Sequence, residues 1–199
     1  MKTTTMSVQE YCSLDKHSRV SYLDQQVRER STDLTEAFVI DALSKENDPL
    51  AKWFLVKACG LLRCTSAIPS LISVCKEPEA EFGETSLHAI CAWSLGKIGS
   101  AAFDPLFELT RAADAETRRC AVDALGELKD TRAVDALCSA LQHDEHQVQL
   151  WAGLSLAKMG KAALNCLERV AAGPAGATRD IALDAIQKIR DHSVSAANT

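Results

Sequence analysis

The sequence predicts an all-α fold: a right-handed α-α superhelix of about five helix pairs, preceded by an N-terminal capping helix. Three observations predict it. The stretch TRRCAVDALGELK at 117–129 recurs along the chain in degraded form, as LVKACGLL, CAWSLGKI, AGLSLAKM and ALDAIQKI. Apolar residues within each copy follow helical spacing. Alanine is abundant and aromatic residues make up only 5% of the chain, which favours closely packed helices over a β-rich core.

The period of the repeat defines the units. Aligned on the glycine of the opening stretch, the equivalent positions are Gly60, Gly96, Gly126, Ala157 and Gln187, with spacings of 36, 30, 31 and 30 residues. A fixed period near 30 residues is typical of a solenoid, in which each unit buries its apolar face against its neighbours.

Each unit is predicted to contain two helices. The sequence indicates a leading helix at 16–30, then pairs at 34–62, 66–98, 101–128, 132–159 and 161–191. Asp48 followed by Pro49 and, later, Asp114 are expected to cap second helices, and 144–147 has capping-box spacing. Small residues are expected where neighbouring helices approach closely, namely Ala121, Ala124, Ala152 and Ala182.

The remaining segments are expected to be irregular. The longer second spacing places a charged insertion at 76–84, between the two helices of the second pair. Residues 1–15 and 192–199 are expected to be flexible ends. The 199 residues are expected to form a single domain, with the helical repeats at about 34–191.

Composition limits the classes of partner. The net charge is −5, from 22 basic and 27 acidic residues, so nucleic acid is not the expected partner and a basic protein surface is mildly favoured. No segment resembles a secretory signal or a membrane span, which leads us to expect a cytoplasmic protein. The eight cysteines form no Cys-x-x-Cys pair, so we expect reduced thiols, with a redox role as the alternative.

The segment DxxTRRCAVDALGELKDTRAVDAL resembles the HEAT repeat, and in particular the short HEAT-like variety of phycobilisome lyase subunits. The resemblance covers about 34–191 and is strongest in the middle three units. It implies that the second helix of each pair lines a concave face that binds another macromolecule. It also implies a structural role for Arg118 and Arg179, which would bond turn carbonyls or a turn aspartate of an adjacent unit.

Candidate binding residues lie on the second helices, at the positions expected to face the groove. Trp93, Leu150 and Leu154 are apolar there, which indicates either an exposed binding cluster or helices that rotate to bury them. Asp180 and Asp184 lie one turn apart and, with Asp123, suggest an acidic wall for a basic partner, the alternative being a solvated helix face. The full predicted partner-binding set is Trp53, Lys57, Trp93, Arg119, Asp123, Leu150, Leu154, Asp180 and Asp184.

Catalytic and metal-binding motifs are not found in the sequence. It contains no glycine-rich nucleotide loop, no Gly-x-Ser-x-Gly and no His-Glu-x-x-His. The run from His143 to His146 has two histidines with acids between them, but it lies in a predicted turn and is interpreted as solvated. A Cys/His pair brought together in space stays open. We therefore expect no cofactor and no metal site.

The sequence favours a non-enzymatic protein-interaction module that binds a dedicated protein partner, of the adaptor, assembly-chaperone or toxin-immunity type. Two alternatives follow from the resemblance. The first is a bilin lyase subunit or another chromophore-handling protein. The second is a HEAT-like nucleic-acid binder, such as the alkyl-purine DNA glycosylases built on this architecture, and the mixed charges of the groove positions argue against it.

Overall fold

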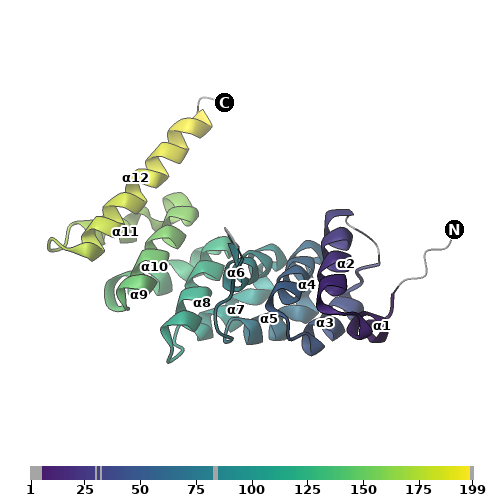
Figure 1. Cartoon of the computed structure of the whole chain (residues 1–199). Coiled ribbons are helices and arrows are strands. Elements are labelled where there is room, and N and C mark those ends of the chain that lie inside the picture. Colours follow the sequence, from purple (N-terminus) through teal and green to yellow (C-terminus); the bar gives the residue numbers. More distant parts are fainter. Residues whose placement is uncertain (1–5, 30, 32, 83–84, 198–199) are drawn as a thin grey trace. The chain divides into compact units, whose positions relative to one another are not determined.

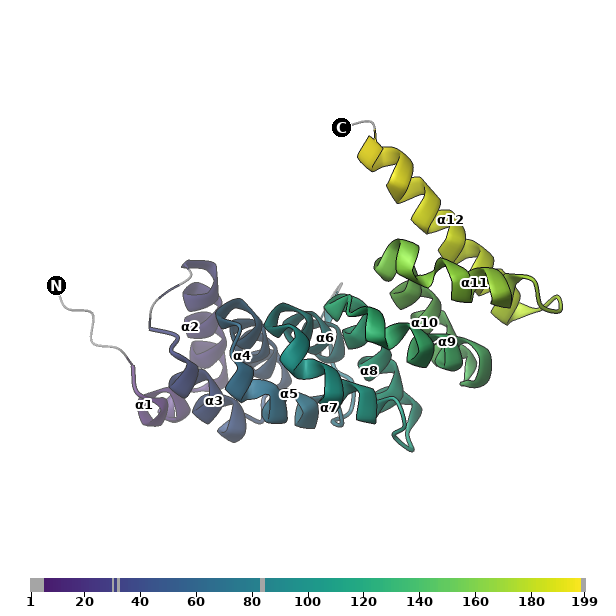
Figure 2. The same cartoon turned by 180° about the vertical axis from the view of Figure 1, so that it is seen from behind.

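The computed structural model describes residues 6–29, 31, 33–82 and 85–197, and it consists of paired helices (Figures 1 and 2). The chain divides into two compact units, Met1–Ala102 (unit 1) and Phe103–Thr199 (unit 2). Parts of three segments expected to be irregular, namely 1–5, 83–84 and 198–199, lie outside the described residues.

Unit 1 begins with two helices that precede the first pair. Its elements are α1 (Val8–Ser13), α2 (Lys16–Glu29), α3 (Glu36–Lys45), α4 (Pro49–Leu62), η1 (Thr65–Ala67), α5 (Ile68–Val74), β1 (Glu81–Phe82), β2 (Thr85–Ser86), α6 (Leu87–Ile98) and η2 (Ser100–Ala102). Helix α4 packs against α2, α3 and α6. The predicted leading helix and the first two helix pairs are therefore confirmed.

Unit 2 contains the remaining three pairs. Its elements are α7 (Phe103–Leu109), α8 (Ala115–Leu128), η3 (Thr131–Ala133), α9 (Val134–His143), α10 (His146–Met159), η4 (Gly160–Ala163), α11 (Leu164–Ala171) and α12 (Ala177–Ala197). Helix α10 packs between α8 and α12, so the second helices of three successive pairs lie side by side. The all-α, HEAT-like architecture predicted from the sequence is confirmed.

Two of the three predicted helix caps are present. The Asp48 side chain accepts a hydrogen bond from the amide of Ala51 at 3.0 Å, and Asp114 accepts one from Thr117 at 2.7 Å. The capping box at 144–147 was wrong. The N-cap of α10 is Glu145 and makes no side-chain cap, and Arg118 donates to the carboxylates of both Asp144 and Glu145.

Close contacts between second helices depend on a glycine facing a serine. In unit 1 the hydroxyl of Ser94 donates to the carbonyl of Val56 at 2.8 Å, and a Cβ added at Gly60 would lie 2.8 Å from the Ser94 Cα. In unit 2, Ser155 donates to the carbonyl of Val122 at 3.0 Å. Gly60 in unit 1 and Gly126 in unit 2 therefore let the backbone of the next helix approach closely enough for this bond.

The predicted small positions in unit 2 are fully buried. Ala121, Ala124, Ala152 and Ala182 all lie in the core, together with Leu125, Leu137, Leu141, Leu156 and Leu167. Burial of these leucine side chains stabilises the unit by roughly 1.5–3 kcal/mol each before the loss of conformational entropy is counted.

Three segments expected to be irregular contain regular structure. Helix α1 lies within 1–15, where the hydroxyl of the buried Tyr11 donates to Glu46 at 2.6 Å. In the 76–84 insertion, Phe82 pairs with Thr85 in an antiparallel two-stranded hairpin. At the other end, α12 continues to Ala197.

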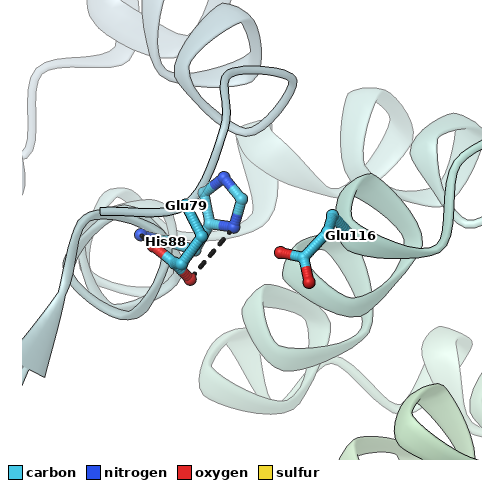
Figure 3. A group of neighbouring side chains, drawn as sticks. All are labelled: Glu79, His88 and Glu116. Carbon is cyan, nitrogen blue, oxygen red and sulfur yellow. Dashed lines mark hydrogen bonds and ion pairs between the residues drawn. The ribbon is translucent and has the colours of Figure 1, made fainter. Parts of the chain in front are cut away.

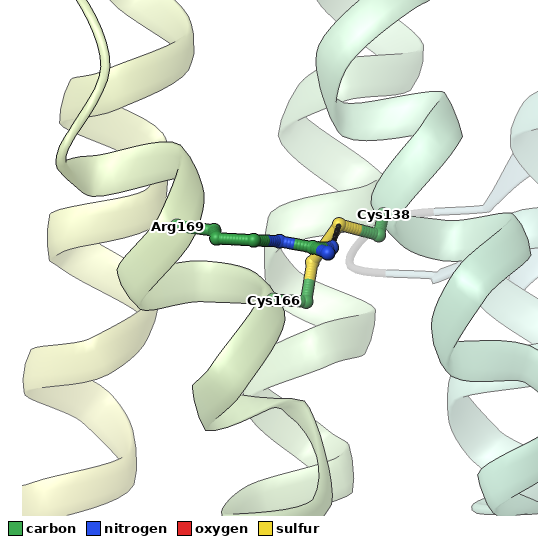
Figure 4. Close-up of a disulfide and its surroundings, with 3 residues drawn as sticks. All are labelled: Cys138, Cys166 and Arg169. Carbon is green, nitrogen blue, oxygen red and sulfur yellow. Dashed lines mark hydrogen bonds between the residues drawn. A yellow bond between two sulfur atoms is a disulfide. The ribbon is translucent and has the colours of Figure 1, made fainter.

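Two cysteines of unit 2 are joined, contrary to the expectation of reduced thiols. A disulfide links Cys138 on α9 to Cys166 on α11, with 6.2 Å between the two Cα atoms (Figure 4). Nη2 of Arg169 lies 3.8 Å from the Cys138 sulfur. The bond cross-links the first helices of two successive pairs.

None of the described helices is both long enough and apolar enough to span a membrane.

Candidate interaction surface

An exposed apolar ridge runs along α10. It consists of Leu150 and Leu154, one helical turn apart, which are 42% and 38% exposed. The neighbouring Trp151 is half-buried. The small residues Ala152 and Gly153 of the same helix are buried, and a Cβ added at Gly153 would lie 2.3 Å from the Ile181 side chain of α12. Of the two interpretations left open by the sequence, exposure therefore holds for both leucines.

Arg119 on α8 is not exposed, which corrects its expected position on an open groove. The residue is 7% exposed. Its guanidinium carbon lies 5.3 Å from the centre of the Trp151 ring, in a cation-π contact, and Nη2 lies 3.4 Å from Glu116. The indole of Trp151 on the neighbouring helix thus covers Arg119, and the Arg119 guanidinium packs against the Trp151 ring.

Asp123 is also buried, at 5% exposure, so it forms no part of an open acidic wall. The ammonium of Lys158 on α10 lies 2.8 Å from Asp123 and 2.6 Å from Glu127. Burial raises the pKa of the Asp123 carboxyl, and the nearby Lys158 only partly offsets that effect. For Lys158, burial lowers the pKa, but its contacts with Asp123 and Glu127 outweigh that effect and leave the pKa raised.

The two remaining acidic candidates lie on α12. Asp180 and Asp184 are both exposed. Asp184 is 2.6 Å from the ammonium of Lys188, one turn further along the same helix. The predicted pair is therefore present on one helix face, but one of its two charges is compensated locally.

The unit 1 candidates lie on α4 and α6. Trp53 and Trp93 are both half-buried. Lys57 lies over the ring of Trp53 with its Nζ 4.8 Å from the ring centre, and Lys97 lies over Trp93 at 5.4 Å. Each indole is thus shielded by the lysine one turn further along its own helix.

The predicted structural role of Arg118 is confirmed. Its guanidinium donates to the carbonyls of Ala112 and Ala113, both at 2.9 Å, and to the carboxylate of Asp144 in the next turn at 2.8 Å. Partial burial would raise the pKa of Asp144, but the hydrogen bonds from Arg118 and from the Glu145 amide outweigh it and hold that pKa below its ordinary value.

Two residues in the same repeat position as Arg118 bind turns by different chemistry. Lys52 forms an ion pair with Glu77 at 2.6 Å, in the turn of the following pair. His88 is buried, with Nε2 donating to the carbonyl of Glu77 at 2.9 Å and Nδ1 3.1 Å from Glu79 (Figure 3). Alignment of this repeat position with an arginine did not predict that Lys52 and His88 bind turns. The sequence feature that indicates these roles is the pair of acidic residues Glu77 and Glu79 in the turn.

The histidine pair at the α9–α10 turn shows no metal-binding arrangement. His143 ends α9, His146 begins α10, and both are exposed. Asp144 between them is bound by Arg118. Within the described parts of unit 2, no group of three potential ligands converges at this turn.

Comparison with known proteins supports the repeat assignment. Residues 103–187 match the family model described as HEAT repeats. No curated protein sequence matches the chain.

Two solved structures have a similar fold. One is the complex of CpcE and CpcF of phycocyanin lyase from Nostoc sp. PCC7120, with a TM-score of 0.53, 19% identity, and coverage of 93% of this chain and 77% of that chain. The other is the designed armadillo repeat protein YIII(Dq.V1)4CPAF in complex with the peptide (KR)4, with a TM-score of 0.52, 18% identity, and coverage of 92% and 97%. At such identities the likeness concerns the fold alone. Residues 103–187 therefore match the HEAT-repeat model, and the fold of the chain is similar to that of helical-repeat solenoids.

Proposed function

We propose that this chain is a non-enzymatic protein-interaction module that binds a dedicated protein partner through the second helices of unit 2, as an adaptor, assembly chaperone or toxin-immunity protein would. The observation that carries the proposal is the α10 ridge. Leu150 and Leu154 are large apolar side chains held in solvent, next to the half-buried Trp151. Exposed apolar clusters edged by charge are typical of protein-binding sites.

The side chains around the ridge support this assignment. Asp180 and Asp184 are exposed on the adjacent α12, where they are suited to fix the orientation of a partner. Arg119 and Asp123 contribute indirectly, because they hold Trp151 and Lys158 in place from the neighbouring helix. We assign Trp53, Lys57 and Trp93 of unit 1 to a separate contact surface.

The fold is consistent with this role, since helical repeat solenoids present extended surfaces to macromolecules. The designed armadillo repeat protein of similar fold was solved with a peptide bound.

The test is capture of partner proteins from a lysate of the native host by three versions of the full chain. They are wild type, Leu150→Ser/Leu154→Ser, and the matched control Leu61→Ser/Leu62→Ser. Leu61 and Leu62 are also 42% and 38% exposed, but they lie in unit 1. We expect a stoichiometric partner that wild type and the control retain and the α10 variant loses. Loss with the control alone would move the interface to unit 1.

The chromophore-handling alternative rests on fold likeness to the phycocyanin lyase complex. Binding of a bilin by the purified protein, seen as a coloured complex, would favour it over the protein-interaction function. A protein that stays colourless in the presence of bilin would exclude it.

A further inference from the structure

A pocket of about 530 Å³ opens beside the α10 ridge, at the C-terminal ends of α8 and α10 and against α12. Four lysines line it: Lys129, Lys158, Lys161 and Lys188. Its lining includes no aspartate and no glutamate. This is a local concentration of positive charge in a chain whose net charge is −5. We refer to it as the lysine pocket.

Part of the lining of the lysine pocket is apolar. Trp151, Leu154 and Ile189 contribute to its lining, and Leu154 also belongs to the α10 ridge. The ridge and the pocket are therefore continuous. The volume lies within the range of roughly 300–1,000 Å³ found for ligand sites, and it is large enough for one bulky apolar side chain together with its neighbouring backbone.

The four lysine ammonium groups of the pocket differ in whether an acidic side chain neutralises them. Lys158 is paired with Asp123 and Glu127, and Lys188 is paired with Asp184. Lys129, which caps the C-terminus of α8, and Lys161 in η4 are exposed and form no ion pair with any described residue. Two exposed positive charges in the pocket lining are thus available to a ligand.

We propose that the lysine pocket binds an acidic peptide segment of the protein partner. One large apolar side chain would insert against Trp151 and Leu154, and flanking carboxylates would pair with Lys129 and Lys161. The inference rests on the proposed protein-binding function and adds the chemistry of the partner. The sequence favours a partner with a basic surface, whereas this inference requires an acidic partner segment. Asp123, part of the predicted acidic wall, is buried and paired with Lys158.

The apolar side chains in the pocket lining favour a peptide ligand over nucleic acid. A nucleic-acid site needs a basic groove that follows the phosphate backbone over several nucleotides. Here the lysines line one pocket together with aliphatic and indole side chains, which matches an apolar anchor with neighbouring carboxylates.

The test uses fluorescence anisotropy with the full chain and labelled peptides of about twelve residues, each carrying a central Leu-Phe pair. The flanking residues are Glu and Asp in one peptide, Gln in the second and Lys in the third. We expect the acidic peptide to bind about tenfold or more tightly than the Gln peptide, and to weaken as salt rises. We expect the Lys peptide to bind more weakly than either.

Variants locate the binding. Lys129→Glu/Lys161→Glu is expected to weaken binding of the acidic peptide by about tenfold or more. Lys129→Gln/Lys161→Gln serves if charge reversal impairs folding. The matched control is Lys76→Glu, which changes an exposed lysine of unit 1 outside the pocket. Equal binding of the three peptides, unchanged affinity in the lysine variants, or tighter binding of a single-stranded oligonucleotide than of the acidic peptide would overturn the inference.

The outcomes separate this inference from the proposed function. If the α10 variant loses a captured partner while the acidic peptide shows no preference, the interaction function stands and the lysine pocket assignment fails. If wild type captures no partner but the acidic peptide binds and depends on Lys129 and Lys161, the pocket assignment stands without an identified partner.

Discussion

Single residues set how closely the second helices of unit 2 approach each other. Alignment of the repeat predicts small side chains along this contact, and the structure confirms Ala121, Ala124 and Ala152 as buried. The alignment does not predict that Ser155 faces Gly126, because the pairing depends on the vertical register between two helices. Helical period alone leaves that register undetermined.

We expect Gly126→Ala to lower the free energy of unfolding by about 1–3 kcal/mol. An added Cβ would lie 2.5 Å from Oγ and 2.8 Å from Cα of Ser155, so the α10 backbone would have to shift. Ser155→Ala is the matched control, because it removes the hydroxyl without adding atoms and is expected to cost about 1 kcal/mol or less. Thermal or urea denaturation followed by circular dichroism measures both. Equal effects of the two substitutions would contradict the close-contact interpretation.

The bond between Arg118 and Asp144 shows what a family resemblance can predict at a single residue. The resemblance gave the role of Arg118 correctly, because the turn aspartate of the next pair is part of the repeat. By contrast, the buried Nε of Arg179 has no hydrogen-bond partner among the described residues.

We expect Asp144→Asn to weaken the acid sensitivity of unit 2. The folded protein holds the pKa of Asp144 below its ordinary value. Its contribution to stability is therefore present above the unfolded pKa of about 3.9 and is lost as pH falls through the lower folded pKa. Melting temperatures measured from neutral pH downward should differ between wild type and variant near pH 7 and converge in acid.

Asp135→Asn is the control for that measurement, since Asp135 is exposed on α9 and forms no ion pair with the described residues. It should change the melting temperature little at any pH. A constant difference between wild type and Asp144→Asn down to the lowest pH would show that the carboxylate charge is not what stabilises the turn.

Arg119 and Asp123 show where repeat columns mislead. The sequence places both in columns that face the groove in every unit, and on α12 the corresponding Asp180 and Asp184 are exposed. On α8 the larger side chains of the neighbouring α10, Trp151 and Lys158, extend over them. Exposure at such positions depends on the length of the side chains on the neighbouring helix. An alignment of one repeat position across the units carries no information about those neighbours.

At the scale of helices, existence and pairing were predictable, and the ends and connections were less so. Strong apolar periodicity and local caps such as Asp114 specify a helix from neighbouring residues alone. The capping box of Ser7 and Glu10 at the start of α1 was not predicted, although it is a local signal. The contacts between Tyr11 and Glu46 and between Trp53 and Thr85 of the hairpin join distant parts of the chain. The sequence carries no local signal for such contacts.

The disulfide also depends on helix packing. Cys138 and Cys166 lie on the first helices of consecutive pairs, α9 and α11, with their Cα atoms 6.2 Å apart. Their sequence separation of 28 residues does not indicate a bond by itself.

We expect the disulfide to stabilise unit 2 by about 3 kcal/mol, through the reduced conformational freedom of the unfolded chain. Dithiothreitol should lower the melting temperature of wild type. Cys138→Ala/Cys166→Ala should melt at a lower temperature than oxidised wild type and should not respond to the reductant. If the melting temperature of wild type is the same with and without dithiothreitol, the bond does not stabilise the unit.

At the scale of the whole molecule, the net charge does not describe the charge around the proposed site. The acidic surplus favours a basic partner, but charge is distributed locally. Lysine recurs one residue after the aligned position in three units, as Lys97, Lys158 and Lys188. The last two line one pocket in unit 2. That recurrence was visible in the sequence, whereas the convergence with Lys129 and Lys161 requires the packing of α8, α10 and α12.

The central claim is that the α10 ridge is a protein-binding surface, and site-specific photo-crosslinking in the native host tests it most directly. The photoreactive residue p-benzoylphenylalanine is placed at Leu154 on the ridge or at Ser139, which is exposed on the first helix α9 of the same pair. We predict a discrete crosslinked partner from position 154 and none from position 139. Crosslinks at position 139 alone, or none at position 154 while the same chain captures a partner, would contradict the claim.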